Sequence, residues 1–212
     1  MSGTPTVRSR AQQRRSQATF ETILVAAGVL FDESGIEATT MEAISRRAEV
    51  SIGAVYRFFE NREAIVRTLA ARWRERIQEV ALPQFSDDSL KRDAAAVITD
   101  FLEGFRQTLD QLPGARGLLS AVATQPTTDE TVLWTAHLER FIQRYAPGLR
   151  PARRRQAAYT YQAITTALMT GAAGAGQRIT PQLNETRSVL LGYTNQLAIE
   201  AAATNGRSPR TR

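Results

Sequence analysis

TTMEAISRRAEVSIGAVYRFFENRE, residues 39–63, is the stretch of the sequence that decides the fold. It contains two short segments in which apolar residues recur with helical spacing. Thr39 and Glu42 have the spacing of a capping box, and Thr40 is an equally good cap. Ser51 is placed to cap the second segment. The stretch therefore predicts two short helices joined by a tight turn.

The apolar residues of these two helices indicate a shared core. Ile44 and Ala48 point inward from the first helix, and Val55 and Phe59 from the second. Phe31, from the helix before them, completes the cluster. Two short helices, a turn of a few residues and a second helix with a free outer face are typical of a helix-turn-helix.

The free face of the second helix carries small or slim residues. A helix that meets base edges in the major groove needs little bulk there, and its capped N-terminus offers backbone N–H groups to a phosphate. The alternative is an ordinary helical hairpin with solvated arginines, and the acids of the same stretch weaken the basic case. The small residues are Ser51, Ile52, Gly53 and Ala54, and the acids are Glu42, Glu49, Glu60 and Glu63.

Outside this stretch, nearly every periodic segment has the helical period, so we expect an all-α fold of about nine helices. A chain of 212 residues suits one or two domains. We expect a basic flexible arm over residues 1–15, a helix-turn-helix domain over 16–62, a second helical domain over 63–204 and a disordered tail over 205–212. A boundary inside the long fourth helix, or just after it, is also consistent with the sequence.

The composition argues against several classes of protein. There is no cysteine and a single histidine, so disulfides, thiolate nucleophiles and multi-histidine metal sites are excluded. With no nucleophile motif and no phosphate-binding loop, we expect neither an enzyme nor a bound metal or cofactor. We find no membrane span or signal peptide and expect a cytoplasmic protein. The net charge is +6, and the arginines of the first residues suit either a polyanion or a solvated tail.

The sequence AAGVLFDESGIEATTMEAISRRAEVSIGAVYRFFENREAI, residues 26–65, resembles the N-terminal domain of the TetR-type (tetracycline-repressor-like) transcriptional regulators. The resemblance covers about a quarter of the chain. It rests on matches that follow one another in order: Leu30-Phe31, Gly35, Thr39-Thr40, Ala48, Val50-Ser51, Gly53, Val55-Tyr56, Phe58-Phe59, Asn61-Arg62 and Glu63.

The resemblance implies that some residues contact the phosphates of DNA and others contact its bases. It implies phosphate contacts by Thr40, Ser51, Tyr56 and Arg62, and contacts with the bases by Arg46 or Arg47, Ile52, Gly53 and Ala54. Arg57 would also reach the backbone, and the arm with Arg14 and Arg15 would cross it.

Three positions depart from the family pattern. Glu49 stands where a turn glycine is usual, so it would have to adopt a left-handed conformation at a cost of about 1 kcal/mol. Phe58 replaces a residue that is often Tyr or His and has no donor for a phosphate. Arg62 replaces Lys, which keeps the charge and changes the geometry.

The C-terminal helices carry aromatic residues at helical spacing. Core packing explains each of these residues taken singly, and the family resemblance implies that the region lines an effector pocket. We predict His137 to be a satisfied core histidine, with a ligand anchor as the alternative. The candidate pocket residues are Trp73, Phe101, Phe105, Trp134, His137, Leu138, Phe141 and Tyr145.

The last two helices suit a four-helix dimer interface, because one is rich in small residues and the other has an apolar stripe. The alternative is that the stripe packs within its own bundle. The predicted interface residues are Ala163, Ala167, Gly171, Leu183, Leu190 and Leu197.

The predicted function is a homodimeric, ligand-responsive DNA-binding regulator. We expect a repressor that binds palindromic double-stranded operator DNA and is released by a small hydrophobic or aromatic effector, with activation as the open alternative. The alternative from another class is a ligand-binding or scaffold protein whose helix-turn-helix does not read DNA.

Overall fold

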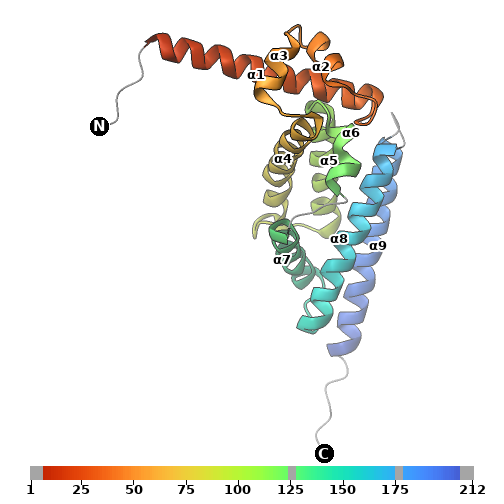
Figure 1. Ribbon diagram of the computed structural model, residues 1–212. Helices are drawn as coiled ribbons and strands as arrows, with labels where there is room; N and C mark the ends of the chain where they lie inside the picture. Colours follow the sequence, from red (N-terminus) through yellow and green to blue (C-terminus); the bar gives the residue numbers. More distant parts are fainter. Residues whose placement is uncertain (1–6, 124–127, 175–178, 206–212) are drawn as a thin grey trace, which may run out of the picture. The chain divides into compact units, whose positions relative to one another are not determined.

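The computed structural model of the chain describes residues 7–123, 128–174 and 179–205, and all their regular elements are helices (Figure 1). This confirms the predicted all-α fold, with nine α-helices and two short 3₁₀ helices among the described residues. They are α1 (Val7–Ser34), α2 (Met41–Arg47), α3 (Ile52–Phe58), α4 (Arg62–Ala81), η1 (Leu82–Phe85), η2 (Ser89–Lys91), α5 (Ala94–Gln111), α6 (Ala115–Ala123), α7 (Thr128–Tyr145), α8 (Pro151–Gly174) and α9 (Ile179–Asn205).

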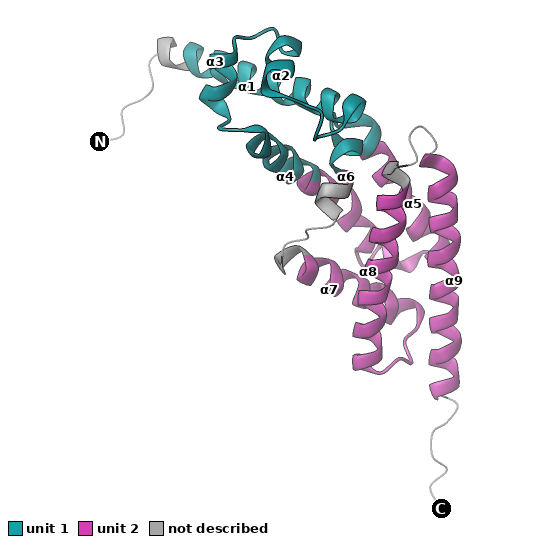
Figure 2. Cartoon of the chain, turned by 45° about the vertical axis from the view of Figure 1, so that its right-hand side comes forward, with its two compact units in different colours: residues 1–73, 109–118 teal, residues 74–108, 119–212 magenta. Residues whose placement is uncertain are grey.

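The chain divides into two compact units (Figure 2). Unit 1 comprises residues 1–73 with 109–118, and unit 2 comprises residues 74–108 with 119–212. The division falls after Trp73, inside α4, where the sequence also allowed a boundary. It lies eleven residues after residue 62, the other boundary expected from the sequence. α4 is one continuous helix and so belongs to both units.

α1 begins earlier than predicted. It is helical from Val7, so the expectation of a flexible arm is wrong for residues 7–15. The physical reason lies in local propensity: residues 7–27 contain no glycine or proline and are rich in Arg, Gln and Ala. Residues 1–6 and the predicted tail after Asn205 lie outside the described residues.

The helix-turn-helix of unit 1 has the predicted core. Ile44 and Val55 are fully buried, and Phe31 of α1 is 1% exposed. Phe59 is 3% exposed and stacks on Phe20 of α1 with ring centroids 5.1 Å apart. α1 therefore provides the apolar surface against which α2 and α3 pack. This tertiary packing stabilises two helices of only seven residues each.

The turn between α2 and α3 has the backbone conformation predicted for it. Glu49 has a φ of 54°, the left-handed conformation that a glycine would adopt without strain. The turn is held by Val50, whose N–H donates to the carbonyl of Ser45 at 3.1 Å. The Ser45 hydroxyl donates in return to the carbonyl of Val50 at 2.8 Å. These two bonds offset the cost of placing glutamate there.

Segment 109–118 packs on α1 within unit 1 by close backbone approach. A methyl group on Gly28 would lie 2.6 Å from the carbonyl of Pro113, so no larger residue fits there. The Asp32 carboxylate accepts hydrogen bonds from the N–H groups of Gly114 and Gly117, at 2.8 and 2.9 Å. Asp32 therefore caps the first turn of α6 from another helix.

In unit 2, α8 packs against both α7 and α9, and α8 and α9 run side by side (Figures 1 and 2). The stripe of α9 faces this bundle: Leu183, Leu190 and Leu197 are 7%, 1% and 1% exposed in the single chain. They are therefore not available as dimer contacts, and that part of the predicted interface is wrong. The apolar stripe needed a partner, and α8 of the same chain provides it.

Candidate nucleic-acid interface and aromatic cluster

Both helices of the helix-turn-helix are capped by hydroxyl groups, and of the two candidates for the first helix Thr40 is the cap, whereas the Thr39 hydroxyl donates to the carbonyl of Gly35 at 2.8 Å. The Thr40 hydroxyl accepts from the N–H of Ala43 at 3.1 Å, and the Ser51 hydroxyl accepts from the N–H of Ala54 at 3.2 Å. Beyond the buried Val55, the other side of α3 is open to solvent. The first turn of α3 therefore offers small side chains and oriented N–H groups to an approaching surface.

Gly53 has no role in the fold that the structure reveals. Its backbone φ is not in the left-handed region, and a methyl group placed on it would have no protein atom within 4 Å. Glycine inside a helix costs about 1 kcal/mol relative to alanine. No contact with another described part of the chain therefore requires a glycine at this position.

Two larger side chains flank Gly53 on the exposed side of α3. Ile52 is 38% exposed and Tyr56 is 50% exposed. A half-exposed tyrosine combines an apolar ring with a hydroxyl that donates to a phosphate, and isoleucine offers apolar contact to a thymine methyl. Together they give α3 the chemistry of a groove-reading helix.

The arginines around α3 are held loosely. Arg47 pairs with Glu33 at 2.9 Å, and both side chains are about half exposed. The Arg57 guanidinium lies 4.9 Å from the centroid of the Phe58 ring. Arg46 is exposed at the end of α2. Exposed ion pairs contribute about 0–1 kcal/mol, so a phosphate can replace Glu33 at little cost.

Arg62 has a structural role, in contrast to the predicted phosphate contact. Its side chain is 23% exposed, and its Nη1 donates to the carbonyls of Ile36 and Glu37, both at 3.0 Å. Its Nη2 donates to the carboxylates of Glu37 and Glu63, both at 3.1 Å. We therefore correct its role: Arg62 ties the start of α4 to the connection between α1 and α2.

Phe58, another of the three departures from the family pattern, packs against α1. Its ring meets Phe20 edge to face, with centroids 5.9 Å apart, and it is partly buried. The loss of a phosphate donor is therefore accompanied by a gain in contact between α3 and α1.

The exposed beginning of α1 extends the basic surface of unit 1. Arg14 and Arg15 are exposed, as are all residues from 11 to 18. Where α1 meets the rest of unit 1, Arg72 binds the Glu21 carboxylate through both terminal nitrogens, at 2.5 and 2.8 Å. These hydrogen bonds from Arg72 lower the pKa of Glu21 below its usual value.

Unit 2 contains an aromatic cluster centred on Phe85, a residue that is not among the candidate pocket residues named from the sequence. Its side chain is 5% exposed. Its ring lies edge to face with four others, at centroid distances of 5.9 to 6.3 Å. Those rings belong to Phe101, Trp134, His137 and Phe141. Proline and polar neighbours made the segment look like a surface loop, so the sequence held no signal for this burial.

The structure brings most of the candidate pocket residues together. Phe105, Leu138 and Phe141 are buried, and Tyr145 lies on Phe141 with centroids 4.8 Å apart. Trp73 belongs to unit 1, whereas the others belong to unit 2.

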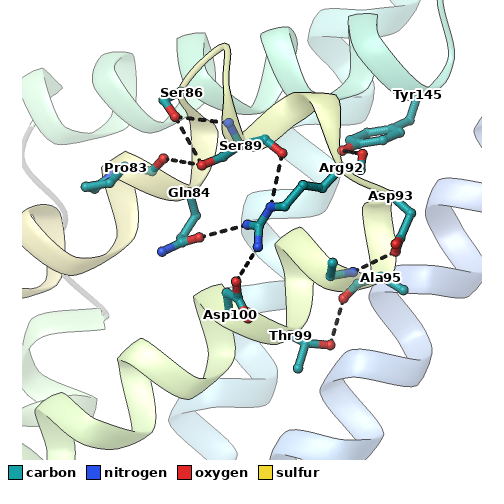
Figure 3. Close-up of polar contacts among 11 residues, drawn as sticks. Pro83, Gln84, Ser86, Ser89, Arg92, Asp93, Ala95, Thr99, Asp100 and Tyr145 are labelled. Carbon is teal, nitrogen blue, oxygen red and sulfur yellow. Dashed lines mark hydrogen bonds and ion pairs between the residues drawn. The ribbon is translucent and has the colours of Figure 1, made fainter.

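The segment between α4 and α5 is fastened to its neighbours. Arg92 donates to the Asp100 carboxylate at 2.5 Å and to the Gln84 side chain at 3.2 Å (Figure 3). The Tyr145 hydroxyl donates to the carbonyl of Arg92 at 2.8 Å (Figure 3). These contacts fix residue 92 to α5 and α7.

His137 is satisfied within its own helix. Its Nδ1 lies 2.9 Å from the carbonyl of Leu133, one turn earlier, so this nitrogen carries the proton. The His137 side chain is partly buried, and its ring lies edge to face with that of Phe85.

The exposed faces of α8 and α9 keep the small residues of the predicted interface. Ala163, Ala167 and Gly171 are exposed at four-residue intervals on α8. Tyr159 continues this row and is 47% exposed. On α9, Val189 and Ile199 are 42% and 64% exposed. These residues, in place of the buried leucines, form the apolar surface available to a second copy.

Residues 7–123, 128–174 and 179–205 contain no cluster of three or more His, Asp or Glu side chains that could hold a metal ion. No helix among them is long and apolar enough to cross a membrane.

Comparison with known proteins starts from the helix-turn-helix. Residues 23–69 match the family described as "Bacterial regulatory proteins, tetR family". The A-factor receptor protein of Streptomyces griseus is 39% identical over 59 residues, which are 28% of this chain and 21% of that protein. The chain thus matches about a fifth of that relative's length.

Two solved structures share the fold over most of the chain. A TetR-family transcriptional regulator from Streptomyces coelicolor is 24% identical, with a TM-score of 0.56 over 84% of this chain and 99% of that one. SmeT, the repressor of the Stenotrophomonas maltophilia multidrug efflux pump SmeDEF, is 23% identical, with a TM-score of 0.60 over 85% and 90%. The family match is thus confined to residues 23–69, and the two solved structures, both less than 25% identical, show that the chain shares their fold.

Proposed function

We propose that the protein is a repressor that binds a palindromic operator as a homodimer and leaves it when a small aromatic or hydrophobic effector binds unit 2. The observation that carries the DNA-binding part is the bare first turn of α3. Gly53 has open space around it and Tyr56 is half exposed. This allows the backbone of α3 to come close to base edges in the major groove.

We assign the DNA contacts to exposed residues of α2 and α3, their caps and the start of α1. Thr40, Ser51, Tyr56 and Arg57 position the domain on phosphates, and Arg46, Ile52, Gly53 and Ala54 face the bases. Arg47 joins the phosphate contacts after leaving Glu33, and Arg14 and Arg15 extend them along the backbone. Arg62 stabilises the domain by holding the start of α4 to the connection between α1 and α2.

A homodimer suits a palindromic site. An isologous dimer places two recognition helices in half-sites about one DNA turn apart. The surface we assign to it is the exposed row of α8 with Val189 and Ile199 of α9. The small side chains of Ala163, Ala167 and Gly171 allow a partner helix to approach closely.

The effector site we assign is the aromatic cluster of unit 2. Rings that meet edge to face favour a planar aromatic or a compact hydrophobic guest, and the His137 ring adds a polar atom. α4 belongs to both units, so a change at its C-terminal end reaches the helix-turn-helix along one helix. The effector lowers operator affinity only by its differential affinity for the two states.

Selection from random double-stranded DNA tests this function. The purified full chain should enrich a palindromic sequence and bind it at least about a thousandfold more tightly than random DNA at moderate salt. Sedimentation should give a dimer. A folded protein that enriches no sequence would support the alternative of a ligand-binding or scaffold protein in the cytoplasm.

A further inference from the structure

The two turns of α3 differ in their side-chain chemistry. The second turn contains Tyr56 and Arg57, whose side chains can donate hydrogen bonds. The side chains of the first turn have neither a donor nor an acceptor, and they belong to Ile52, Gly53 and Ala54. The part of α3 that we assign to the bases therefore has no side-chain group that recognises a base by hydrogen bonding.

Ile52 is the large side chain of this first turn, and it is 38% exposed. Its neighbour Gly53 leaves the helix surface open, because a methyl group placed there would have no atom of another described segment within 4 Å. Tyr56 lies one turn after Ile52 on the same side of the helix and is 50% exposed. A surface that comes close to Gly53 therefore meets an apolar side chain beside it.

The polar groups nearest to this turn have other contacts. The Ser51 hydroxyl accepts from the N–H of Ala54 at 3.2 Å as the cap of the helix. The Arg57 guanidinium lies 4.9 Å from the centroid of the Phe58 ring, at the other end of α3. Among the base contacts that we assign, hydrogen bonding therefore falls to Arg46 of α2, which is exposed and whose guanidinium fits the acceptors of guanine.

The major groove has one apolar feature that differs between the bases. Thymine carries a methyl group on C5, and the other three bases of unmodified DNA lack it. Contact with this methyl group needs no hydrogen-bonding atom, since it removes apolar surface of both partners from water. The branched Ile52 side chain has few rotamers, so little of its freedom is lost in making such a contact.

We infer that α3 recognises the methyl group of a thymine through Ile52, and that it does not read the hydrogen-bonding pattern of that base pair. This inference rests on the proposed function and names the chemistry of the operator. Each half-site contains a thymine whose methyl group lies against Ile52. A 5-methylcytosine carries a methyl group at the same ring position, so α3 accepts it there better than it accepts cytosine.

Substitutions of single bases in the selected DNA site test this inference. Each thymine of one half-site, on either strand, is replaced in turn by deoxyuridine, which lacks only the methyl group. A second series places cytosine or 5-methylcytosine at the same positions, paired with guanine. Fluorescence anisotropy gives the affinities of the wild type, Ile52→Ala and Val25→Ala. The last variant is the matched control, because Val25 is a 51% exposed aliphatic residue on α1 of the same unit.

The inference predicts a specific combination of results. At one thymine of the half-site, deoxyuridine should lower the affinity of the wild type and of Val25→Ala about three- to tenfold, as expected for one buried methyl group. At that position, 5-methylcytosine should bind about three- to tenfold more tightly than cytosine. Ile52→Ala should bind the thymine and deoxyuridine sites equally. Its melting temperature should stay close to that of the wild type, because alanine favours the helix.

Other results would overturn the inference. The wild type alone decides the first point: equal affinity for thymine and deoxyuridine at every position, or a selected half-site without thymine, would refute it. Undiminished sensitivity to deoxyuridine in Ile52→Ala would assign the methyl contact to another group. The same loss of sensitivity in Val25→Ala would show that the effect is not specific to Ile52. A wild type that enriches no DNA sequence would refute the proposed function itself, whereas an enriched site without methyl dependence would refute only the inference.

Discussion

Asp32 on α1 accepts a hydrogen bond of 2.8 Å from the backbone N–H of Gly114, just before the first turn of α6. Its second oxygen accepts from the N–H of Gly117 at 2.9 Å. One carboxylate thus satisfies two donors of a helix start, from a residue more than eighty positions away in the sequence.

Replacing this cap should destabilise unit 1. Asp32→Ala leaves two N–H groups without their acceptor, and we expect a loss of about 1–2 kcal/mol in the free energy of unfolding, measured in urea. Asp32→Asn keeps one acceptor oxygen and should lose less. Equal stability of Asp32→Ala and wild type would show that water replaces the carboxylate at no cost.

Tyr56 should contribute to DNA binding and not to the fold. It is 50% exposed, so Tyr56→Ala should leave the melting temperature and the dimer unchanged. The affinity of Tyr56→Ala for the selected site should fall. Tyr56→Phe removes only the hydroxyl, and its loss of binding free energy should be about 0.5–1.5 kcal/mol. Fluorescence anisotropy with labelled DNA measures both. Unchanged affinity in Tyr56→Ala would remove the residue from the interface.

Replacing Arg62 should affect the stability of the fold, whereas replacing Arg46 should affect DNA binding. Arg62→Lys loses the fork that reaches two backbone carbonyls and should reduce stability by about 1–3 kcal/mol. Arg46→Gln, at an exposed position, should leave stability unchanged and reduce the slope of log affinity against log salt by about 0.9 per lost phosphate contact. A reduced salt slope in Arg62→Lys at full stability would restore the predicted phosphate contact.

The Glu21–Arg72 pair should make the stability of unit 1 weakly dependent on pH in the acid range. The pKa of Glu21 is lowered from 4.5, chiefly by the hydrogen bonds from Arg72, so the pair stabilises the fold above about pH 4.5 and is lost as the pH falls through the lowered value. Because both side chains are more than a third exposed, the contribution should stay below about 1 kcal/mol. Glu21→Gln should flatten the stability curve between about pH 5 and 3. A steeper curve in the variant would contradict this assignment.

The helix-turn-helix could be predicted because its signals are local. The caps at Thr40 and Ser51 and the inward residues Ile44 and Val55 lie within one short stretch, so spacing alone placed them correctly. Even the strained turn at Glu49 followed from the sequence, since the family pattern marks a glycine there.

Apart from the early start of α1, the errors concern contacts between residues that lie far apart in the sequence. The burial of Phe85 depends on rings from α5 and α7, and its own neighbours look like a loop. The apolar pattern that includes Leu190 looks the same in the sequence whether the helix that packs on it belongs to the same chain or to a second copy. The pattern alone therefore could not identify the partner. The carbonyls that hold Arg62 belong to the connection before α2, which its local pattern cannot reveal.

The most direct test of DNA reading is the affinity of Gly53→Leu for the selected site. The variant should be at least as stable as the wild type, because a Cβ atom there has no neighbouring side chain or other segment of the described chain within 4 Å and leucine favours the helix. Its affinity should fall at least about a hundredfold, toward that for random DNA, with Gly53→Ala intermediate, because bulk holds α3 away from the bases. A stable Gly53→Leu dimer that binds the selected site as tightly as the wild type would contradict the central claim that α3 reads DNA by close approach.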